Sequence, residues 1–170
     1  MFRLPSLGGL AGIAVVALVA CSDSTGPATA TLTAVSPVPA ATSVAPSTAI
    51  TLTFGQPMMA GMEQYMDLHQ GDIAGPTVPM SCGWNPDRTI LTCSPSSPLA
   101  AGTEYCIHVG AGMTDDNGHM MAMDDWTTMG GQWVTSGMMG GTHAGQPMAM
   151  MGAGWKHGSH YGMVFTFTTA

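Results

Sequence analysis

The side chains of this sequence that could do metal chemistry are concentrated in residues 119–163. These 45 residues contain ten methionines, four histidines and three tryptophans, but no leucine and no isoleucine. A segment that only fills a core normally uses Leu and Ile, because methionine is flexible and specifies packing poorly. Thioether sulfurs select Cu(I) and its heavier analogue Ag(I), and imidazole binds copper in either oxidation state. The composition therefore predicts a soft-metal site, with copper as the expected ion.

The candidate ligands form local groups, separated by Gly and Ala residues that let the backbone fold closely around an ion. His157 and His160 are close enough in sequence to bind one ion from a loop. A second Met-rich patch, residues 58–62 with Met66 and His69, lies outside the segment and would enlarge the site if the fold brings the two together. The predicted metal ligands are His119, Met120, Met121, Met123, Met138, Met139, His143, Met148, Met150, Met151, His157 and His160.

Two other interpretations of the segment remain open. It could be a packed flap or a partner-binding surface, in which Trp126, Trp133 and Trp155 anchor a small core and methionine fills the gaps. Its methionines could also be oxidised sacrificially to the sulfoxide. Met163 alternates with core residues and is expected to point inward, whereas His108 is expected on a solvated strand face.

Composition limits the fold and the function. Only 8% of the 170 residues are charged, while 23 are Gly and 12 are Pro, which favours short strands and many turns over long solvated helices. After residue 20 the chain has two fixed cations, Arg88 and Lys156, against ten acidic side chains, a formal charge of −8. This deficit excludes nucleic-acid binding. No nucleophile elbow, HExxH motif or phosphate-binding glycine loop is present, so we expect no enzyme.

The first residues of the chain are typical of an export signal. Arg3 precedes an apolar run that continues to Ala20, and the sequence Leu18-Val19-Ala20-Cys21 resembles the lipobox of bacterial lipoproteins, whose cysteine is acylated. The alternative is an ordinary signal peptide cleaved at a small residue. Ser22 after the cysteine indicates the outer membrane. We therefore predict a signal peptide at 1–20, membrane lipid attached through Cys21, and a flexible tether at 21–33.

The elements that must position the ligands are predicted to be strands. Residues 50–54, 89–93, 105–109 and 164–168 each alternate apolar and polar side chains with a period of two, and turn residues separate them. Short strands at this spacing predict an all-β protein, an antiparallel β-sandwich.

The same strands carry a family resemblance. Five segments, which include Pro98-Leu99-Ala100-Ala101-Gly102-Thr103-Glu104-Tyr105, resemble in order the SbsA-type bacterial Ig-like domain. The resemblance covers residues 34–118 and 164–170 and implies an Ig-like sandwich of about seven strands, used as a spacer or display module without catalytic residues. The sequence departs from the family at residues 119–163, where a short connection is expected. We call these residues the insertion, and predict one domain at 34–170 that contains it.

Cysteine placement is consistent with export. If Cys21 is acylated, three thiols remain, and an oxidising compartment favours a disulfide. Cys82 and Cys93 flank the turn at residues 85–88, so a hairpin would bring them opposite each other, and this is the preferred pair. Pairings with Cys106 stay open; otherwise Cys106 is a small buried residue or a free thiol.

These features together predict an exported, lipid-anchored Ig-like protein of the cell envelope that binds Cu(I) or Ag(I). Its role would be to buffer the metal or to transfer it, with envelope metal-handling or surface proteins as partners. The alternative is a structural or adhesive cell-surface module with no ligand, in which the insertion is a packed flap or a partner-binding surface.

Overall fold

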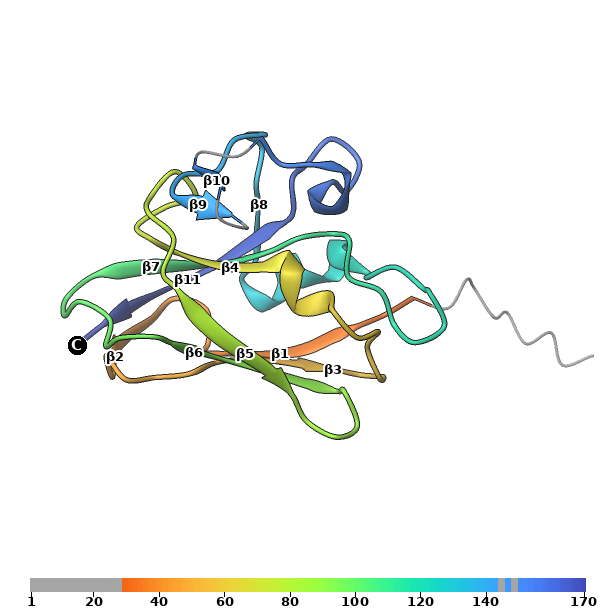
Figure 1. Ribbon diagram of the computed structural model, residues 1–170, viewed down its shortest axis with the longest axis horizontal. Coiled ribbons are helices and arrows are strands. Elements are labelled where there is room, and N and C mark those ends of the chain that lie inside the picture. Colours follow the sequence, from red (N-terminus) through yellow and green to blue (C-terminus); the bar gives the residue numbers. More distant parts are fainter. Residues whose placement is uncertain (1–28, 144–145, 148–149) are drawn as a thin grey trace, which may run out of the picture.

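A computed structural model describes residues 29–143, 146–147 and 150–170 and shows an all-β sandwich of two facing sheets (Figure 1). The first sheet has the order β1 (Leu32–Ser36), β3 (Ile50–Phe54), β6 (Ile90–Pro95) and β5 (Met80–Trp84). The second has the order β2 (Ala41–Val44), β11 (Met163–Thr169), β7 (Glu104–Val109) and β4 (Met66–Gln70), and the short β8 (Gln132–Trp133) also pairs with β11. Outside these sheets lie the 3-10 helices η1 (Met62–Tyr65), η2 (Met123–Met129) and η3 (Ala153–Trp155) and the hairpin of β9 (Thr142–His143) and β10 (Gln146–Pro147).

The alternating sequence pattern produces the core between the sheets. In β3 the side chains of Ile50, Leu52 and Phe54 are buried, and the threonines between them are partly exposed. In β11 the side chains of Met163, Phe165 and Phe167 are buried in the same way, so the prediction that Met163 points inward is confirmed. The predicted strands at 50–54, 89–93, 105–109 and 164–168 correspond to β3, β6, β7 and β11. The prediction of an all-β Ig-like sandwich is therefore confirmed.

The later part of the insertion forms a third layer, which covers the outer face of the second sheet, while its first residues, including Met123 and Trp126, pack in the main core. Figure 1 shows β9 and β10 above β4, β7 and β11, on the side away from the first sheet. A second hydrophobic cluster of Val134, Met139, Met151 and Trp155 lies in this layer and packs against Val164, which points outward from β11. A sheet face that is normally solvated is therefore an interior in this protein.

The third layer overturns the expected environment of His108. Both Cys106 and His108 alternate with the inward-facing residues of β7, and yet both are buried. The ring of Trp155 in η3 stacks on the His108 imidazole with 4.4 Å between ring centroids. The prediction of a solvated strand face for His108 is wrong, because the period of two determines which face a side chain takes but not what covers that face.

The N-terminal boundary of the sandwich lies before the predicted residue 34. Ala30 is buried in the main core, and its backbone N–H donates to the Met120 carbonyl oxygen at 2.9 Å. The strand β1 then begins at Leu32. Residues 29–33 are therefore part of the folded domain. The predicted signal peptide, Cys21 and the tether up to residue 28 lie outside the described residues.

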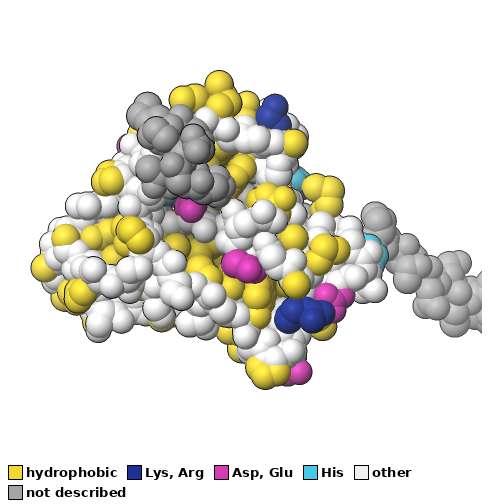
Figure 2. All heavy atoms as spheres, in the orientation of Figure 1, with side chains coloured by type: hydrophobic (Ala, Val, Ile, Leu, Met, Phe, Trp, Pro, Cys, Tyr) yellow, Lys and Arg dark blue, Asp and Glu magenta, His cyan; other side chains and the backbone are white. Residues whose placement is uncertain are grey.

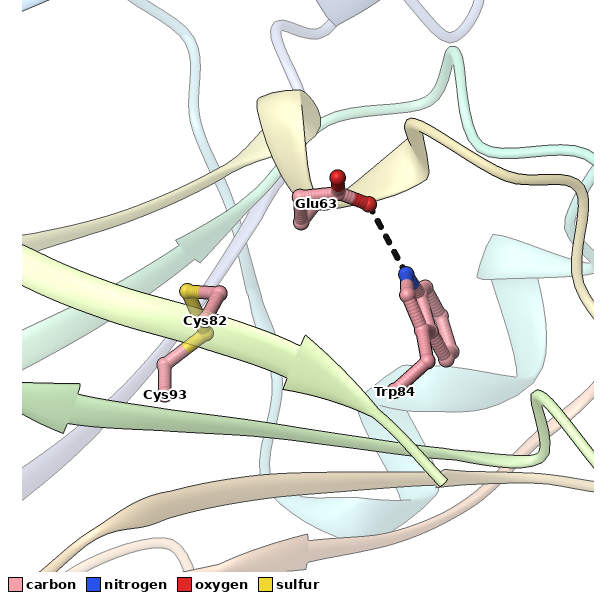
Figure 3. The surroundings of a disulfide bond; sticks show 4 residues. All are labelled: Glu63, Cys82, Trp84 and Cys93. Atoms are coloured by element: carbon pink, nitrogen blue, oxygen red, sulfur yellow. Dashed lines mark hydrogen bonds between the residues drawn. A yellow bond between two sulfur atoms is a disulfide. The ribbon is translucent and has the colours of Figure 1, made fainter. Parts of the chain in front are cut away.

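A disulfide joins the edge strand of the first sheet to its neighbour. Cys82 of β5 lies directly opposite Cys93 of β6, and their sulfurs are 1.99 Å apart (Figure 3). On the same strand, the indole N–H of Trp84 donates to the Glu63 carboxylate of η1 at 2.8 Å. The remaining thiol among the described residues, Cys106, is free and buried. In the described part of the chain, no helix has both the length and the apolar character needed to cross a bilayer.

Candidate metal centre

The predicted methionine ligands separate into buried and exposed groups. Met121 and Met123 lie in the core between the sheets, and Met139 and Met151 lie in the second hydrophobic cluster. All four are almost fully buried among apolar side chains. Each therefore fills an interior, as the packed-flap interpretation expects of methionine.

The exposed methionines of the insertion lie in two different places. Met138 and Met150 are opposite each other in an isolated antiparallel bridge, which puts both thioethers on one face at the surface. Met120 lies at the other end of the insertion, where it bridges to Thr114. Met148 lies outside the described residues, as does the side chain of His143.

Thr114 is the point where the two Met-rich patches of the sequence meet. Its backbone N–H donates to the Met62 sulfur at 3.2 Å, and its hydroxyl lies 3.7 Å from the same sulfur. The hydroxyl also lies 3.9 Å from the Met59 sulfur. Because Met120 is opposite Thr114 in an antiparallel bridge, the Met120 side chain projects from the same face. We call Met59, Met62 and Met120 the thioether cluster.

Backbone contacts position the loop that carries Met59 and Met62. The Met59 N–H donates to the Thr114 carbonyl oxygen at 3.0 Å, and Met58 forms an isolated bridge with Asp115. Arg88 lies in the turn before β6. Its guanidinium donates to the Met58 carbonyl oxygen at 2.7 Å and pairs with the Asp116 carboxylate. The cluster is therefore supported by the backbone on both sides, which limits the rearrangement needed to bind an ion.

The thioether cluster is accessible from solvent. Met59 is 40% exposed and Met120 is 56% exposed, while Met62 is 8% exposed with its sulfur on the Thr114 amide. The Met59 and Met62 sulfurs lie near the Thr114 hydroxyl, and the Met120 side chain projects from the same face. Thioether sulfurs are neutral soft donors that do not have to lose protons before they bind an ion. Sequence reasoning placed Met59 and Met62 in the second patch and did not count them among the ligands. Their Met-rich composition was the signal, but only the fold brings them to Met120.

His119, the residue before Met120, is held by a buried carboxylate. Its Nδ1 lies 2.8 Å from Asp115 Oδ2, and the backbone N–H groups of His119 and Asn117 donate to Asp115 Oδ1. Burial alone would raise the pKa of the Asp115 carboxyl, but these hydrogen bonds outweigh it and hold the pKa below its usual value. A carboxylate on Nδ1 orients the imidazole and makes Nε2 the nitrogen that could bind a metal.

His157 and His160 occupy a separate place on a tight turn. Their backbones exchange hydrogen bonds of 3.0 Å in both directions, and both imidazoles stack on Trp133. His157 Nε2 also lies 3.5 Å from an Asp124 carboxylate oxygen. Within the described residues, no group of three or more His, Cys, Asp or Glu side chains is arranged to hold a metal ion. A metal site in this part of the chain would therefore depend on methionine sulfur or on fewer than three of these side chains.

The fold and the covered sheet together define an Ig-like sandwich with one elaborated connection. A family model described as bacterial Ig-like domain matches residues 23–128, which is more than half of the sequence. The chain belongs to the bacterial Ig-like domain family. The match includes β1 to β7 and the start of the insertion.

Three solved structures illustrate how distant the structural neighbours are. The S-layer protein rSbsC is 14% identical with a TM-score of 0.42, and the match covers 55% of this chain and 12% of that chain. CopC from Methylosinus trichosporium OB3b is 21% identical with a TM-score of 0.41, covering 54% of this chain and 84% of that one. L,D-transpeptidase 1 from Mycobacterium tuberculosis is 18% identical with a TM-score of 0.37, covering 46% and 34%. No curated protein matches the chain.

Proposed function

We propose that this protein is an exported Ig-like domain of the cell envelope that binds Cu(I) or Ag(I) at its surface and buffers or transfers the ion. The observation that carries the proposal is the thioether cluster, in which the Met59 and Met62 sulfurs lie near the Thr114 hydroxyl and Met120, from a distant part of the sequence, bridges to Thr114 and projects from the same face. His119, the residue before Met120, offers an imidazole on the Asp115 side of this loop. The exposed pair of Met138 and Met150 offers a second, smaller set of thioethers.

The ligand chemistry fits an oxidising compartment. Thioether sulfur cannot be lost to disulfide formation, and a soft neutral donor prefers Cu(I) over the harder cations of the envelope, such as Ca²⁺ and Mg²⁺. The formal charge of −7 for the whole sequence raises the local concentration of cations. Figure 2 shows acidic side chains on the same face as exposed apolar ones.

Three features support the location in the envelope. Residues 1–20 are typical of an export signal, and Cys21 is placed as the lipid-bearing cysteine of a lipoprotein. The disulfide between Cys82 and Cys93 is typical of proteins outside the reducing cytoplasm. We propose lipid attachment through Cys21, at the outer membrane.

The proposal is tested by removing the three sulfurs without removing their volume. Leucine is close to methionine in volume, so a variant with Met59→Leu, Met62→Leu and Met120→Leu should fold. Its affinity for Cu(I), measured anaerobically against a chromogenic chelator, should fall by more than about tenfold, since even outer-shell partners change metal affinity by 10- to 100-fold. The matched control changes three fully buried methionines, Met58, Met113 and Met163, to leucine and should keep its affinity. Equal affinities in the two variants would reject the cluster as the site.

The second candidate function is a structural or adhesive module with no ligand. It is favoured by the packing of the insertion, which buries Trp155, Met139 and Met151 against the second sheet. On this view the purified protein takes up no Cu(I), and the leucine variant of the thioether cluster is unchanged in every property but sulfur content. Neither candidate assigns a catalytic step to the domain.

A further inference from the structure

Two histidines are buried on the outer face of the second sheet, which is covered by the loop at residues 71–78 and by part of the insertion. His69 of β4 and His108 of β7 point outward from the sheet, and both are 0% exposed. Cys106 lies directly opposite His69 in the β4–β7 register and is also buried. Apolar side chains would cover a sheet face at lower cost, because each buried ring nitrogen needs a partner.

The backbone contacts determine which nitrogen of each ring carries a lone pair. His69 Nδ1 lies 3.1 Å from the Gly75 carbonyl oxygen, and His108 Nε2 lies 2.9 Å from the Tyr161 carbonyl oxygen. A carbonyl oxygen only accepts, so in the neutral rings these two nitrogens carry the protons. The lone pairs are therefore on His69 Nε2 and His108 Nδ1. His69 Nε2 is fully buried and has no hydrogen-bond partner.

The distance between the two ring centroids leaves room for a two-coordinate ion between the rings. Their centroids are 6.1 Å apart, with 55° between the ring planes. A metal–nitrogen bond of about 2.0 Å on each side, with the two ring radii added, spans about 6 Å between centroids. Cu(I) and Ag(I) accept two nitrogen ligands in a line, whereas Zn²⁺ is almost always four-coordinate in proteins.

The surroundings have the features of a second ligand shell. Metal-binding histidines usually donate their other N–H to a carbonyl or a carboxylate, as both rings do here. Trp155 stacks on the His108 ring and fixes its plane. Asp67 lies opposite His108 in the β4–β7 register and would offset the charge of a monovalent ion. Burial raises the pKa of the Cys106 thiol to about 12, so Cys106 stays neutral and protonated at pH 7.

A pocket offers a route from solvent to this interior. It has a volume of about 300 Å³ and lies between the sheet and the segment from Gln132 to Ser136. Cys106 lines it, and Asp72 and Glu104 contribute carboxylates that attract cations. Because Cys106 is the cross-strand neighbour of His69, the pocket comes within one side chain of the His69 imidazole.

We propose that His69 Nε2 and His108 Nδ1 form an interior site for one Cu(I) or Ag(I) ion, enclosed by the insertion. The interior site and the thioether cluster have no residue in common. The interior site can therefore be confirmed or rejected independently of the surface site. Its occupancy joins β4 to β7 through one ligand from each strand. The insertion then acts as the lid of a metal site as well as a carrier of thioethers.

The direct test is a long-range ¹H–¹⁵N NMR experiment on the imidazole nitrogens of the purified protein during titration with Ag(I), which is redox-inert. We expect the His69 Nε2 and His108 Nδ1 resonances to shift with one equivalent of Ag(I), while the proton-bearing nitrogens shift little. One equivalent of Zn²⁺ should leave all four resonances in place. If Ag(I) leaves them unchanged, or Zn²⁺ shifts them equally, the interior site does not exist.

Three variants separate this site from the others. The leucine variant of the thioether cluster should keep the His69 and His108 response in full. His69→Phe should lose the response of His108 but keep Cu(I) binding at the thioether cluster. The control His160→Phe, at a half-buried histidine on a separate turn, should keep both. If His69→Phe does not fold, the titration of the unsubstituted protein decides alone. Loss of the response in the thioether variant or in His160→Phe would overturn the assignment.

Discussion

Replacing Trp155 with alanine should open the layer formed by the insertion. Trp155 is buried in η3, where it packs in the second hydrophobic cluster, stacks on His108 at 4.4 Å and meets Tyr65 edge-on at 6.3 Å. No other described aromatic side chain joins the insertion to both β7 and η1 in this way. Its removal should therefore detach the layer built on the second hydrophobic cluster from the second sheet and leave the core between the two sheets in place.

The expected cost follows from the size of the side chain and its burial. Truncating a buried tryptophan to alanine typically costs about 3–5 kcal/mol. For a domain of this length, each kcal/mol lowers the melting temperature by about 2–4 °C. We therefore expect the main transition to fall by roughly 10 °C if the layers unfold together. If the insertion detaches first, an early transition should appear and the transition of the sandwich should change less.

Thiol chemistry gives a local readout of the same change. Cys106 is buried under the insertion, and burial raises the pKa of its thiol to about 12, so it should not react with a chromogenic disulfide reagent at pH 8 in the folded protein. In Trp155→Ala the thiol meets water, its pKa falls toward the ordinary value, and it should react at least tenfold faster. The matched control is Met150→Ala, at an exposed position of the insertion. Fast labelling of the unsubstituted protein, or equal rates in Trp155→Ala and Met150→Ala, would refute the packed layer.

Three further predictions address other parts of the domain. Gly110→Ala places a Cβ 2.7 Å from Trp155 Cε3 and should destabilise the domain by about 1–3 kcal/mol in urea unfolding. The control Gly83→Ala, which has no atom within 4 Å of the new Cβ, should not destabilise it. Equal effects of the two substitutions would contradict the close approach of Gly110 to Trp155. Asp115→Asn should cost about 1–3 kcal/mol at pH 7. The folded pKa of Asp115 lies below its unfolded value, so this stability is present above the unfolded pKa and is lost as the pH falls through the folded pKa. The free energies of unfolding of the variant and the unsubstituted protein should therefore converge in acid. A difference between them that does not depend on pH would contradict this prediction. Replacing both Cys82 and Cys93 with alanine should cost about 2–3 kcal/mol in thermal unfolding, and the added reductant that lowers the stability of the unsubstituted protein should leave the variant unchanged.

The scaffold was predictable because its signals are local. In β3 and β11 the period of two in Ile50-Thr51-Leu52 and Phe165-Thr166-Phe167 depends only on neighbouring residues, so both strands could be located from the sequence. The pairing of Cys82 with Cys93 followed from the turn between them, and the structure joins these two cysteines. The start of the domain was placed too late, because the contact of Ala30 with the insertion is not local.

The candidate site was less predictable because its contacts are long-range. Two adjacent methionines differ in burial: Met120 is exposed, while Met121 is buried in the core. No local pattern distinguishes them, since the difference arises from the bridges to Thr114 and Ala30. The burial of His108 likewise depends on Trp155, which lies 47 positions further along the chain. Composition identified the chemistry, and the fold selected which side chains can take part in it.

The central claim, that methionine sulfur at the surface binds a soft ion, is tested most directly by X-ray absorption at the copper edge. The spectrum would be recorded on protein loaded anaerobically with one equivalent of Cu(I), with the leucine variant of the thioether cluster as the control. The account predicts a shell of sulfur scatterers around copper in the unsubstituted protein that is lost in the variant. A first shell of nitrogen and oxygen alone, or a sulfur shell that persists in the variant, would contradict it.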